Sequence, residues 1–468
     1  MTVSNNLNLR PYQREAVDKL LRLDGCGGLW LAMGTGKTRT ALTIAQELGC
    51  RRVLVVTPPP PATRIWSTEV ESCWPGALCT QAAYGSVVDR AEMMRMVARQ
   101  HNPQIVIVTY YSYWRDRLRK AILYYRPDML ILDEAHRCIH RGAKQTRFAH
   151  TLANYVPHRL GLSGTPAPNG LQDYFSIYKA LRPSLFGTRY ADFESRYIRR
   201  GGYLGYQIVG YQNEDELQEK VAATSYRVAK DVLGLLPPTD VSLQVPLVDT
   251  TVYERIRKKA LADVRGMLNG QHASGTAIAR TALVNVLRLQ QITSGFVKVE
   301  DGNEIELSTE KLDALSELLA DAVLQADHVV VFCRFRHDII AAAKRASKVA
   351  KTFTLWGDTP QGDRDGLLEA FRREPRAVLV ANIAVASVSI DLTCASVAIF
   401  FSLDYSLTNY QQARDRIHRH GQTRHVTYYH LIADVLGRTA SIDEKVLRTL
   451  ARKEDLSRRI LDPVDLFD

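Results

Sequence analysis

The sequence predicts an α/β protein made of two doubly wound parallel-sheet lobes in tandem, with helical insertions. Short apolar runs such as GLWLAM, RRVLVVT, PQIVIVT and DMLILD alternate with helical stretches in the first half of the chain. A second alternating series, with HVVVFC, KTFTL, RAVLVA and SVAIFFS, follows the stretch LGLLPPTD. Strands that are buried on both faces read as continuous apolar runs, and helices between them are typical of parallel sheets. Two such series therefore predict two lobes.

The boundary between the lobes is predicted after residue 229, shortly before a Pro-Pro pair that suits a linker. The first lobe covers residues 1–229 and carries a helical extension from about residue 171. The second lobe covers residues 230–468, with a helical insertion at about 250–300. It ends in an amphipathic helix, for which Ser441 is the predicted N-cap and Glu444 completes a capping box.

The composition is that of a soluble globular protein, with 46% hydrophobic and 24% charged residues. The polar start MTVSNNLNLRPYQ does not resemble a signal peptide, and no apolar run is long enough to span a bilayer. The cysteines form no CxxC pair, which disfavours a zinc site and favours a reducing compartment. We therefore expect a cytoplasmic protein without a membrane partner. Its formal net charge of +11 favours a polyanionic partner, most often nucleic acid.

The stretch LWLAMGTGKTRTALTIAQELG reads as strand, glycine loop and helix, and it predicts a phosphate-binding loop. Gly34 and Gly36, on either side of Thr35, let backbone N–H groups approach phosphates without a Cβ in the way. Lys37 can reach the β- and γ-phosphates of ATP, and the Thr38 hydroxyl can bind Mg²⁺. The full GxxxxGKT pattern has leucine in place of its first glycine. The alternative interpretation is a glycine-rich turn with a chance lysine.

An acidic pair, Asp133 and Glu134, ends the apolar strand MLILD. A carboxylate there can hold Mg²⁺ through water, because Mg²⁺ prefers few carboxylates together with waters and phosphate oxygens. Glu134 can then orient and deprotonate the attacking water. His136 is a candidate relay between the nucleotide and the following segment. The alternatives are an ordinary acidic turn and a surface histidine.

The box Asp133-Glu134-Ala135-His136 resembles the DEAH box of superfamily two helicases. Further stretches stand in that family's order, from LRPYQREAV and LVVTPPPPATRIWSTEVE to GLSGTPAPN, VVVFCRFR and YQQARDRIHRHGQ. The resemblance runs from about residue 8 to about 450 and is greatest to the Swi/Snf branch of duplex DNA translocases. It implies two RecA-like lobes, ATP and Mg²⁺ as cofactors, and double-stranded or branched DNA as the partner. A protein partner stays open, and the compact chain favours a bacterial or phage source.

The resemblance also implies roles for individual residues. Gln13 would read the adenine edge, with Arg10 nearby, and Asp391 would touch the ribose. The segment Ser163, Gly164 and Thr165 would couple the nucleotide state to DNA contacts; the alternative is a plain turn. In the stretch ANIAVASVSIDLT this chain departs from the family, because Ala386, Ser387 and Ser389 stand where glycines are common.

The basic segment QQARDRIHRHGQTRH, residues 411–425, needs an anion opposite it, because like charges three or four residues apart on a helix repel each other. If residues 412–420 are helical, then Gln412, Arg416 and Arg419 share one face. The predicted anion is the γ-phosphate of ATP held by Lys37, so that the two lobes clamp one nucleotide. The alternative is a solvated basic helix that binds nucleic acid directly.

DNA contacts are expected to be sequence-independent phosphate contacts across both lobes. The candidates at loops that match the family are Thr57, Pro58, Thr109, Tyr110, Arg334, Trp356 and Gly357. Further basic candidates are Arg196–Arg200 and the run Arg255, Arg257, Lys258 and Lys259, each of which is individually more typical of a solvated face.

The predicted function is an ATP-dependent duplex DNA translocase or remodeller that couples ATP hydrolysis between two lobes to movement on DNA. A strand-separating DNA or RNA helicase is the first alternative. An ATP-dependent switch or loading subunit that acts through a partner protein is the second. A P-loop ATPase unrelated to nucleic acid fits the phosphate loop but not the other motifs.

Overall fold

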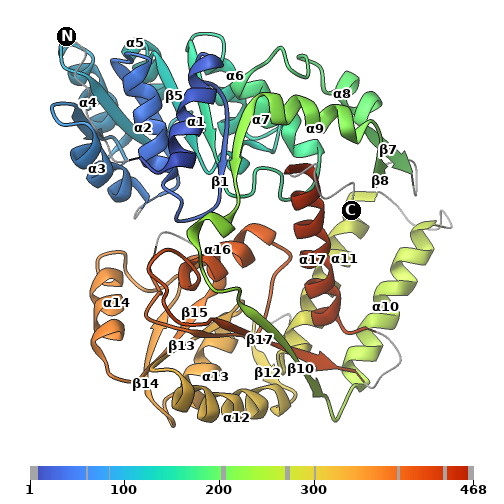
Figure 1. Cartoon of the computed structure of the whole chain (residues 1–468). Helices are drawn as coiled ribbons and strands as arrows, with labels where there is room; N and C mark the ends of the chain where they lie inside the picture. The colour runs from blue at the N-terminus through green and yellow to red at the C-terminus, as the bar shows by residue number, and fades with distance from the viewer. Residues whose placement is uncertain are drawn as a thin grey trace. The chain divides into compact units, whose positions relative to one another are not determined.

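A computed structural model describes residues 9–59, 62–83, 85–201, 207–268, 275–299, 302–386, 390–435 and 440–461. The chain divides into two compact units, Met1–Gly234 with Lys453–Asp468, and Leu235–Arg452. The predicted boundary after residue 229 differs from this division by the short helix η3 (Lys230–Leu233) and Gly234. The residues from Lys453 onward, predicted as part of the second lobe, are grouped with the first unit. Figure 1 labels the helices and strands of both units.

The first unit is built on a seven-stranded sheet with the strand order β3-β4-β2-β5-β6-β1-β9. Every neighbouring pair in it is parallel. The strands are β1 (Cys26–Leu31), β2 (Arg52–Thr57), β3 (Leu78–Gln81), β4 (Gln104–Thr109), β5 (Met129–Asp133), β6 (His158–Leu162) and β9 (Ser225–Val228). Because parallel strands need crossover connections, their carboxyl ends meet at one edge, which is where the functional loops emerge.

Helices cover both faces of this sheet. The helices on one face are α1 (Pro11–Arg22), α2 (Lys37–Glu47) and α3 (Ala62–Cys73), and those on the other are α4 (Val87–Val97), α5 (Asp116–Tyr125), α6 (Lys144–Leu152) and α7 (Gln172–Leu181). Strand β2 shows the alternation: Val53 and Val55 join the first core, whereas Leu54 and Val56 join the second. All four side chains are fully buried, as the continuous apolar run predicts.

The extension after α7 is not purely helical. It contains α8 (Tyr190–Tyr197), an antiparallel hairpin of β7 (Ile198–Gly201) and β8 (Gln207–Tyr211), and α9 (Glu214–Ala223). Edge-to-face and tilted ring contacts join Phe175, Phe186 and Phe193 in its core. The chain then returns to the sheet as β9.

The second unit is built on a six-stranded parallel sheet with the order β10-β17-β16-β13-β15-β14. The strands are β10 (Thr239–Pro246), β13 (His328–Cys333), β14 (Lys351–Leu355), β15 (Ala377–Asn382), β16 (Val397–Phe400) and β17 (Thr427–Asp434). The core on one face includes α12 (Glu310–Gln325) and α13 (Arg336–Ala346), and that on the other includes α14 (Arg364–Arg373), α16 (Leu407–Ile417) and the start of α17 (Ile442–Leu461). The two predicted parallel-sheet lobes are confirmed.

The predicted insertion of the second unit consists of two helices, α10 (Thr251–Leu268) and α11 (Gly275–Thr293), followed by a hairpin of β11 (Phe296–Lys298) and β12 (Glu304–Glu306). At the start of α17, the Ser441 hydroxyl accepts a hydrogen bond from the Glu444 N–H at 3.3 Å, which is the predicted N-cap contact. A buried ion pair between Lys311 and Asp443, at 2.6 Å, ties α17 to α12. Across the described part of the chain, every helix is too short or too polar to cross a bilayer.

Candidate active site

The phosphate loop lies between the end of β1 and the start of α2. Gly34 and Gly36 have φ values of 80° and 83°, in the left-handed region that favours glycine. A Cβ at Gly36 would lie 2.3 Å from the Gln13 Nε2, so a larger residue would also displace the Gln13 side chain. The Lys37 Nζ donates to the Leu31 and Ala32 carbonyl groups at 3.1 and 3.4 Å. The ammonium group therefore folds over the loop, where a phosphate would replace these carbonyl partners.

The remaining residues of the loop hold its shape. The Thr35 hydroxyl donates to the Ala32 carbonyl at 2.7 Å. Thr38 is the second residue of α2, so its backbone N–H belongs to the positive end of that helix. The helix start and Lys37 together supply the donors that an anion requires.

Asp133, the last residue of β5, receives hydrogen bonds from two neighbouring elements. The Thr57 hydroxyl at the end of β2 donates to its Oδ2 at 2.8 Å, and the Trp66 indole N–H on α3 donates at 2.9 Å. Burial raises the pKa of Asp133, and the adjacent Glu134 raises it further, while the two donors and the charge of Lys37 lower it. Two adjacent buried carboxylates are stable only when positive charge lies beside them. Asp133 and Glu134 therefore fit a site for a divalent cation.

Glu134 has a strained backbone, with φ 52° and ψ 57°. A non-glycine residue in the left-handed region costs about 1 kcal/mol or more, and such strain is common at functional sites. The conformation turns the chain from β5 into the short helix η1 (Ala135–Cys138). It thereby places the largely buried Glu134 side chain at the carboxyl end of the sheet.

His136 connects the acidic pair to the predicted coupling segment. Its Nδ1 lies 3.4 Å from the Glu134 Oε2 and 3.2 Å from the Ser163 hydroxyl, which in turn accepts from the Thr165 N–H at 3.1 Å. Burial lowers the pKa of His136 to about 3, so the ring is neutral near pH 7. Gly164 lies beside the end of β1, where an added Cβ would be 3.6 Å from the Leu31 carbonyl oxygen. The structure thus brings these predicted residues together.

Gln13 is buried, and both ends of its amide are bonded within the protein. Its Nε2 donates to the Thr35 carbonyl at 3.0 Å, and its Oε1 accepts from the Arg10 N–H at 2.8 Å. The Tyr12 hydroxyl donates to the same Thr35 carbonyl at 3.1 Å. Gln13 therefore anchors α1 to the phosphate loop, and its reading of adenine stays a prediction.

Several side chains of the basic segment, residues 411–425, are bound to other parts of the second unit. Arg414 forms a bidentate pair with Asp240 on β10, with both N–O distances at 2.7 Å. The His418 Nε2 lies 2.8 Å from the Leu236 carbonyl, and the His425 Nε2 lies 3.2 Å from the Thr239 hydroxyl. These contacts connect α16 and the residues that follow it to the first residues of the unit, and of the four arginines Arg414 is the one paired with Asp240.

The prediction that residues 412–420 form one helix is wrong beyond Ile417. Gln412 and Arg416 lie within α16, whereas Arg419 follows its end, so the three residues do not share one helix face. The helix stops because His418 has φ −94° and ψ 82°. Arg416 is buried, with only 7% of its surface exposed.

Asp391 is exposed, and its Oδ1 accepts hydrogen bonds from the Thr393 N–H and hydroxyl at 3.0 and 2.9 Å. It therefore closes a local turn, and its contact with a ribose stays a prediction. Ala386 is buried at the end of α15 (Ile383–Ala386), whereas Ser387 and Ser389 lie outside the described residues.

The DNA candidates of the first unit are largely buried. The exposed fractions of Thr57, Thr109 and Tyr110 are 0%, 6% and 1%, and Pro58 is also buried. Their side chains fill the interior at the ends of β2 and β4, and the Thr57 hydroxyl holds Asp133. The contact of these residues with DNA stays a prediction.

Two of the DNA-contact candidates in the second unit, Arg334 and Trp356, contact other residues of the protein. The Arg334 guanidinium is bonded to the Gln290 side chain, and burial lowers the pKa of Arg334. Arg336 lies over the Trp356 ring, 4.7 Å from its centroid, and Trp356 packs against the core. An added Cβ at Gly357 would meet open space.

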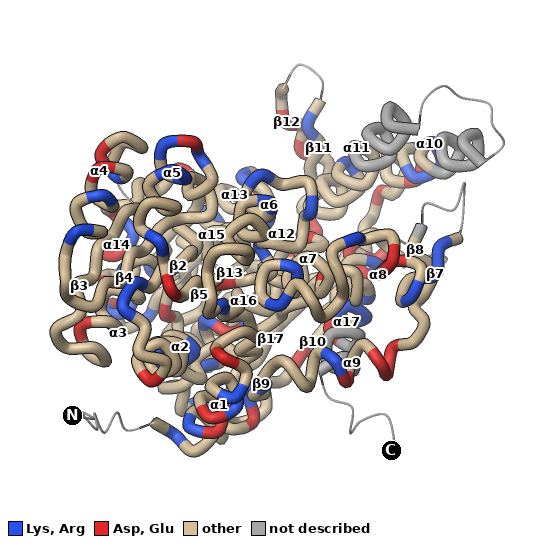
Figure 2. Tube along the Cα trace, turned by 90° about the horizontal axis from the view of Figure 1, so that it is seen from above, with Lys and Arg blue, Asp and Glu red and all other residues tan. Residues whose placement is uncertain are grey.

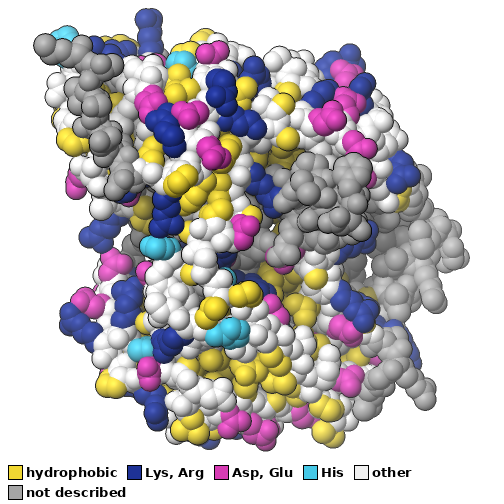
Figure 3. Space-filling model, in the orientation of Figure 1, with side chains coloured by type: hydrophobic (Ala, Val, Ile, Leu, Met, Phe, Trp, Pro, Cys, Tyr) yellow, Lys and Arg dark blue, Asp and Glu magenta, His cyan; other side chains and the backbone are white. Residues whose placement is uncertain are grey.

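Several of the other basic candidates are ion-paired. Arg196 pairs with Glu216 at 2.6 Å, Arg200 pairs with Glu194, and Arg257 pairs with Glu254 at 2.7 Å. Among the side chains of α10 that the structure describes, the exposed basic residues are Arg255, Lys258 and Lys259. On the face shown in Figure 3, Lys and Arg side chains are interspersed with Asp and Glu, as on an ordinary solvated surface.

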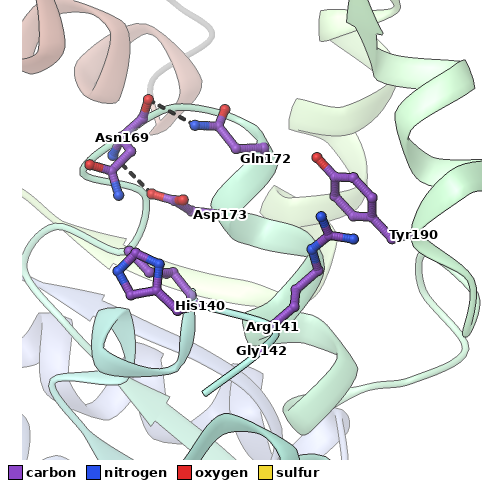
Figure 4. Close-up of a pocket in the computed structure, with 8 residues that line it drawn as sticks. His140, Arg141, Gly142, Asn169, Gln172, Asp173 and Tyr190 are labelled. Atoms are coloured by element: carbon purple, nitrogen blue, oxygen red, sulfur yellow. Dashed lines mark hydrogen bonds between the residues drawn. The ribbon is translucent and has the colours of Figure 1, made fainter. Parts of the chain in front are cut away.

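A cavity of about 550 Å³ lies between the loop after η1 and the start of α7. Figure 4 shows Arg141 against the Tyr190 ring, 3.2 Å from its centroid. Nearby, Asp173 accepts from the Asn169 N–H at 2.8 Å, and burial raises the pKa of Asp173 to about 7. The Gln172 Nε2 donates to the Asn169 carbonyl at 3.0 Å. These bonds fix the start of α7 and, through it, the segment that ends at Thr165.

Two models of known protein families match most of the chain. The family model described as the SNF2-related domain matches residues 12–294, more than half of the chain. The chain belongs to the SNF2 family. The model described as the helicase conserved C-terminal domain matches residues 310–421. The predicted family, the Swi/Snf branch of helicase superfamily two, is confirmed.

Curated relatives of this SNF2-family chain share about a quarter of its residues. It is 24% identical to an uncharacterized ATP-dependent helicase of Mycoplasma genitalium, over 100% of this chain and 44% of that protein. It is 24% identical to the ISWI chromatin-remodeling complex ATPase of Saccharomyces cerevisiae, over 97% of this chain and 41% of that protein. A Caenorhabditis elegans homolog of SWI/SNF-related regulator of chromatin subfamily A-like protein 1 is 26% identical, over 91% of this chain and 58% of that protein. The chain thus spans about half the length of the curated relatives it matches.

Among solved structures, the Sulfolobus solfataricus SWI2/SNF2 ATPase core in complex with dsDNA covers 98% of this chain and 94% of its own. The sequence identity is 22% and the TM-score is 0.43.

Proposed function

We propose that this SNF2-family protein hydrolyses ATP and uses the energy to move along duplex DNA. The observation that carries the ATPase part is the gathering of Lys37 and Asp133 at one sheet edge, close enough for the lysine charge to lower the pKa of the carboxyl group. Lys37 and the start of α2 bind the phosphates, and Glu134 orients and deprotonates the attacking water.

Thr38 and Asp133 are the residues that would hold Mg²⁺. The raised pKa of the buried Asp133 fits such a site, because a bound cation offsets the charge of the two adjacent carboxyl groups. When bound, Mg²⁺ neutralises charge on the phosphate oxygens. Thr57 and Trp66 keep the Asp133 carboxylate in place for that contact.

Gln412, Arg416 and Arg419 of the second unit are proposed to meet the γ-phosphate. Arginine suits this role because it is always charged and its fork matches phosphate oxygens. ATP would then stabilise a closed arrangement of the two lobes, and loss of phosphate would remove the contact that favours it. Alternating grip on DNA during this cycle gives movement.

DNA as the partner is supported by the net charge of +11 and by relatives whose names include chromatin-remodeling ATPases and a DNA annealing helicase. Strand separation and action through a partner protein are compatible with the same observations, and so is a cytoplasmic bacterial or phage setting.

The test is the ATPase rate without nucleic acid and with duplex DNA, single-stranded DNA, forked DNA or RNA, each at two salt concentrations. We expect duplex or forked DNA to stimulate most, and added salt to weaken the stimulation steeply, because several phosphates are neutralised on binding. Greatest stimulation by single strands or RNA, together with strand release, would favour the helicase alternative. Stimulation only by an added protein would favour the switch alternative.

Two substitutions test the chemistry directly. Glu134→Gln should lower the turnover by about 10²–10⁴-fold with ATP binding retained, because only proton abstraction is lost. Lys37→Ala should lower both turnover and ATP affinity, since the lysine contacts the phosphates before and during reaction. A fluorescent ATP analogue measures binding, and phosphate release measures turnover. Normal turnover in Glu134→Gln would remove this residue from the mechanism.

A further inference from the structure

A second cavity of the first unit, about 540 Å³, lies between the starts of α5 and α6. Four basic side chains and two aromatic rings line most of it: Arg115, Arg119, Lys144, Arg147, Trp114 and Phe148. Figure 2, in which Lys and Arg are blue, shows basic positions along both helices. We refer to this cavity as the α5–α6 pocket.

The positive charge of the α5–α6 pocket is not neutralised within the protein. Its one carboxylate is Asp116, the first residue of α5, where the positive end of the helix favours an anion. All four basic residues are exposed, and within the described ranges no acidic side chain forms an ion pair with any of them. This differs from Arg196, Arg200 and Arg257, each of which has a glutamate partner.

The basic groups are also oriented before any anion arrives. The Arg115 Cζ and the Lys144 Nζ lie 5.8 and 5.1 Å from the centroid of the Trp114 ring. The Arg119 Cζ lies 5.9 Å from the centroid of Phe148, a buried ring. Cation–π contacts of this kind restrict long side chains, so less conformational entropy is lost when a ligand binds.

The place of the pocket in the fold connects it with the proposed reaction. Helix α5 follows the carboxyl end of β4, and the segment that leads to α6 follows the carboxyl end of β5. The pocket therefore lies on the edge of the sheet from which the phosphate loop and the acidic pair also emerge. Thr109 and Tyr110 at the end of β4 are buried, whereas Arg115 on the same connection is exposed and can contact an anion.

We propose that the α5–α6 pocket binds backbone phosphates of duplex DNA, independently of sequence. The proposal rests on the proposed function, because it assumes that DNA is the partner. Three of the four cations are arginines, whose forks match phosphate oxygens. The faces of the rings are used by cations, which leaves them unsuited to stacking on a base and favours the backbone.

The experiment compares two quadruple variants of the full chain. The pocket variant carries R115Q, R119Q, K144Q and R147Q. The control variant carries R22Q, R95Q, R99Q and R189Q, exposed residues of the same unit that lie outside the pocket, so both lose four positive charges. Fluorescence anisotropy with a labelled duplex, without ATP, measures the affinity over a series of salt concentrations. Thermal melting checks that both variants are folded.

We expect the pocket variant to bind duplex at least about 10-fold more weakly and to lower the slope of log K against log salt by about 3, because each lost phosphate contact releases roughly one counterion fewer. The control variant should change the slope by less than about 1. Each single substitution in the pocket should lower the slope by about 1, which keeps the test valid if the quadruple variant does not fold.

Equal affinities and slopes in the two quadruple variants overturn the proposal. It is also overturned if the pocket variant keeps its affinity for duplex but loses affinity for polyglutamate, since the pocket would then suit an acidic peptide. If the unmodified protein binds no DNA, the proposed function itself fails, and this outcome is distinct from the other two.

Discussion

At the end of β5, the Asp133 carboxylate is held by single side chains from two neighbouring elements. Thr57 and Trp66 donate to the same oxygen, Oδ2, which directs the other oxygen away from them. Such supporting residues orient a metal ligand and lower the pKa that burial has raised. The candidate site therefore depends on residues that do not touch the nucleotide.

Thr57→Val tests this support, because it removes the hydroxyl group and nearly keeps the shape of the side chain. We expect the Mg²⁺ concentration for half-maximal ATPase activity to rise by about 10-fold or more, as for other supporting residues of metal ligands. Titration of the ATPase rate with Mg²⁺ measures the effect. Thr109→Val is the matched control, since Thr109 ends the adjacent strand and its hydroxyl contacts Ser112 instead. An equal effect in both variants would contradict the role of Thr57.

A buried carboxyl group in the second unit provides a prediction on pH. Asp338 accepts from the Ser294 hydroxyl at 3.2 Å, and burial raises its pKa to about 7. Because the folded state then holds a proton that the unfolded state releases, stability falls as the pH rises from about 4 to about 7. From pH 5 to pH 8, the free energy of unfolding of the natural protein should fall by on the order of 3 kcal/mol relative to Asp338→Asn. Urea unfolding at both pH values tests this, and equal pH dependence in the two proteins would contradict it.

At the scale of elements, helix α16 is bound to the first residues of its unit. Arg414 pairs with Asp240 on β10, and His418 bonds to the carbonyl of Leu236, which lies in the connecting segment. The Arg414 guanidinium also lies over the Tyr428 ring, 4.2 Å from its centroid. The helix that carries Arg416 is therefore linked to the segment through which the chain enters the second unit.

Asp240→Ala should lower the free energy of unfolding of the second unit by about 2 kcal/mol. Removing Asp240 leaves the mostly buried Arg414 guanidinium without its carboxylate, and the exposure of Asp240 keeps the cost below that of a fully buried pair. Chemical denaturation followed by circular dichroism measures the change. Glu369→Ala, which breaks an exposed pair with Arg373 on α14, should change stability by less than about 1 kcal/mol. An equal fall in the free energy of unfolding in the two variants would show that the pair of Asp240 with Arg414 stabilises the protein no more than an exposed pair does.

At the scale of the whole molecule, the two units have separate sheets and separate hydrophobic cores. The phosphate loop and the acidic pair belong to the first unit, and the proposed arginines belong to the second. The two family models match successive parts of this chain, residues 12–294 and 310–421. The proposed cooperation between them is therefore a property that neither unit has alone.

Arg419→Ala tests this cooperation. We expect turnover to fall by about 10³-fold or more, because an arginine that meets the transition-state charge has an effect of that size, while the first unit keeps its affinity for ATP. Phosphate release and binding of a fluorescent ATP analogue measure the two quantities. Arg424→Gln is the control, since Arg424 lies in the same basic segment and is bound to the Cys394 carbonyl within its own unit. Normal turnover in Arg419→Ala would exclude this residue from the reaction.

The sequence by itself determined the parallel strands, the glycine loop and the acidic strand end, because each depends on the periodicity and backbone preference of neighbouring residues. It also indicated the N-cap at Ser441, for the same local reason. The helical insertion was predicted with its position, although its terminal hairpin was not.

Only the tertiary structure decided which side chain each polar group meets. Arg414 and Asp240 are far apart in the sequence, and so are Thr57 and Asp133, so nothing in their local pattern reveals the pairs. The four cations of the α5–α6 pocket likewise come from two helices separated by a strand. Such pairs form when packing brings distant segments together, and that step, rather than local backbone preference, places the Thr57 hydroxyl against Asp133.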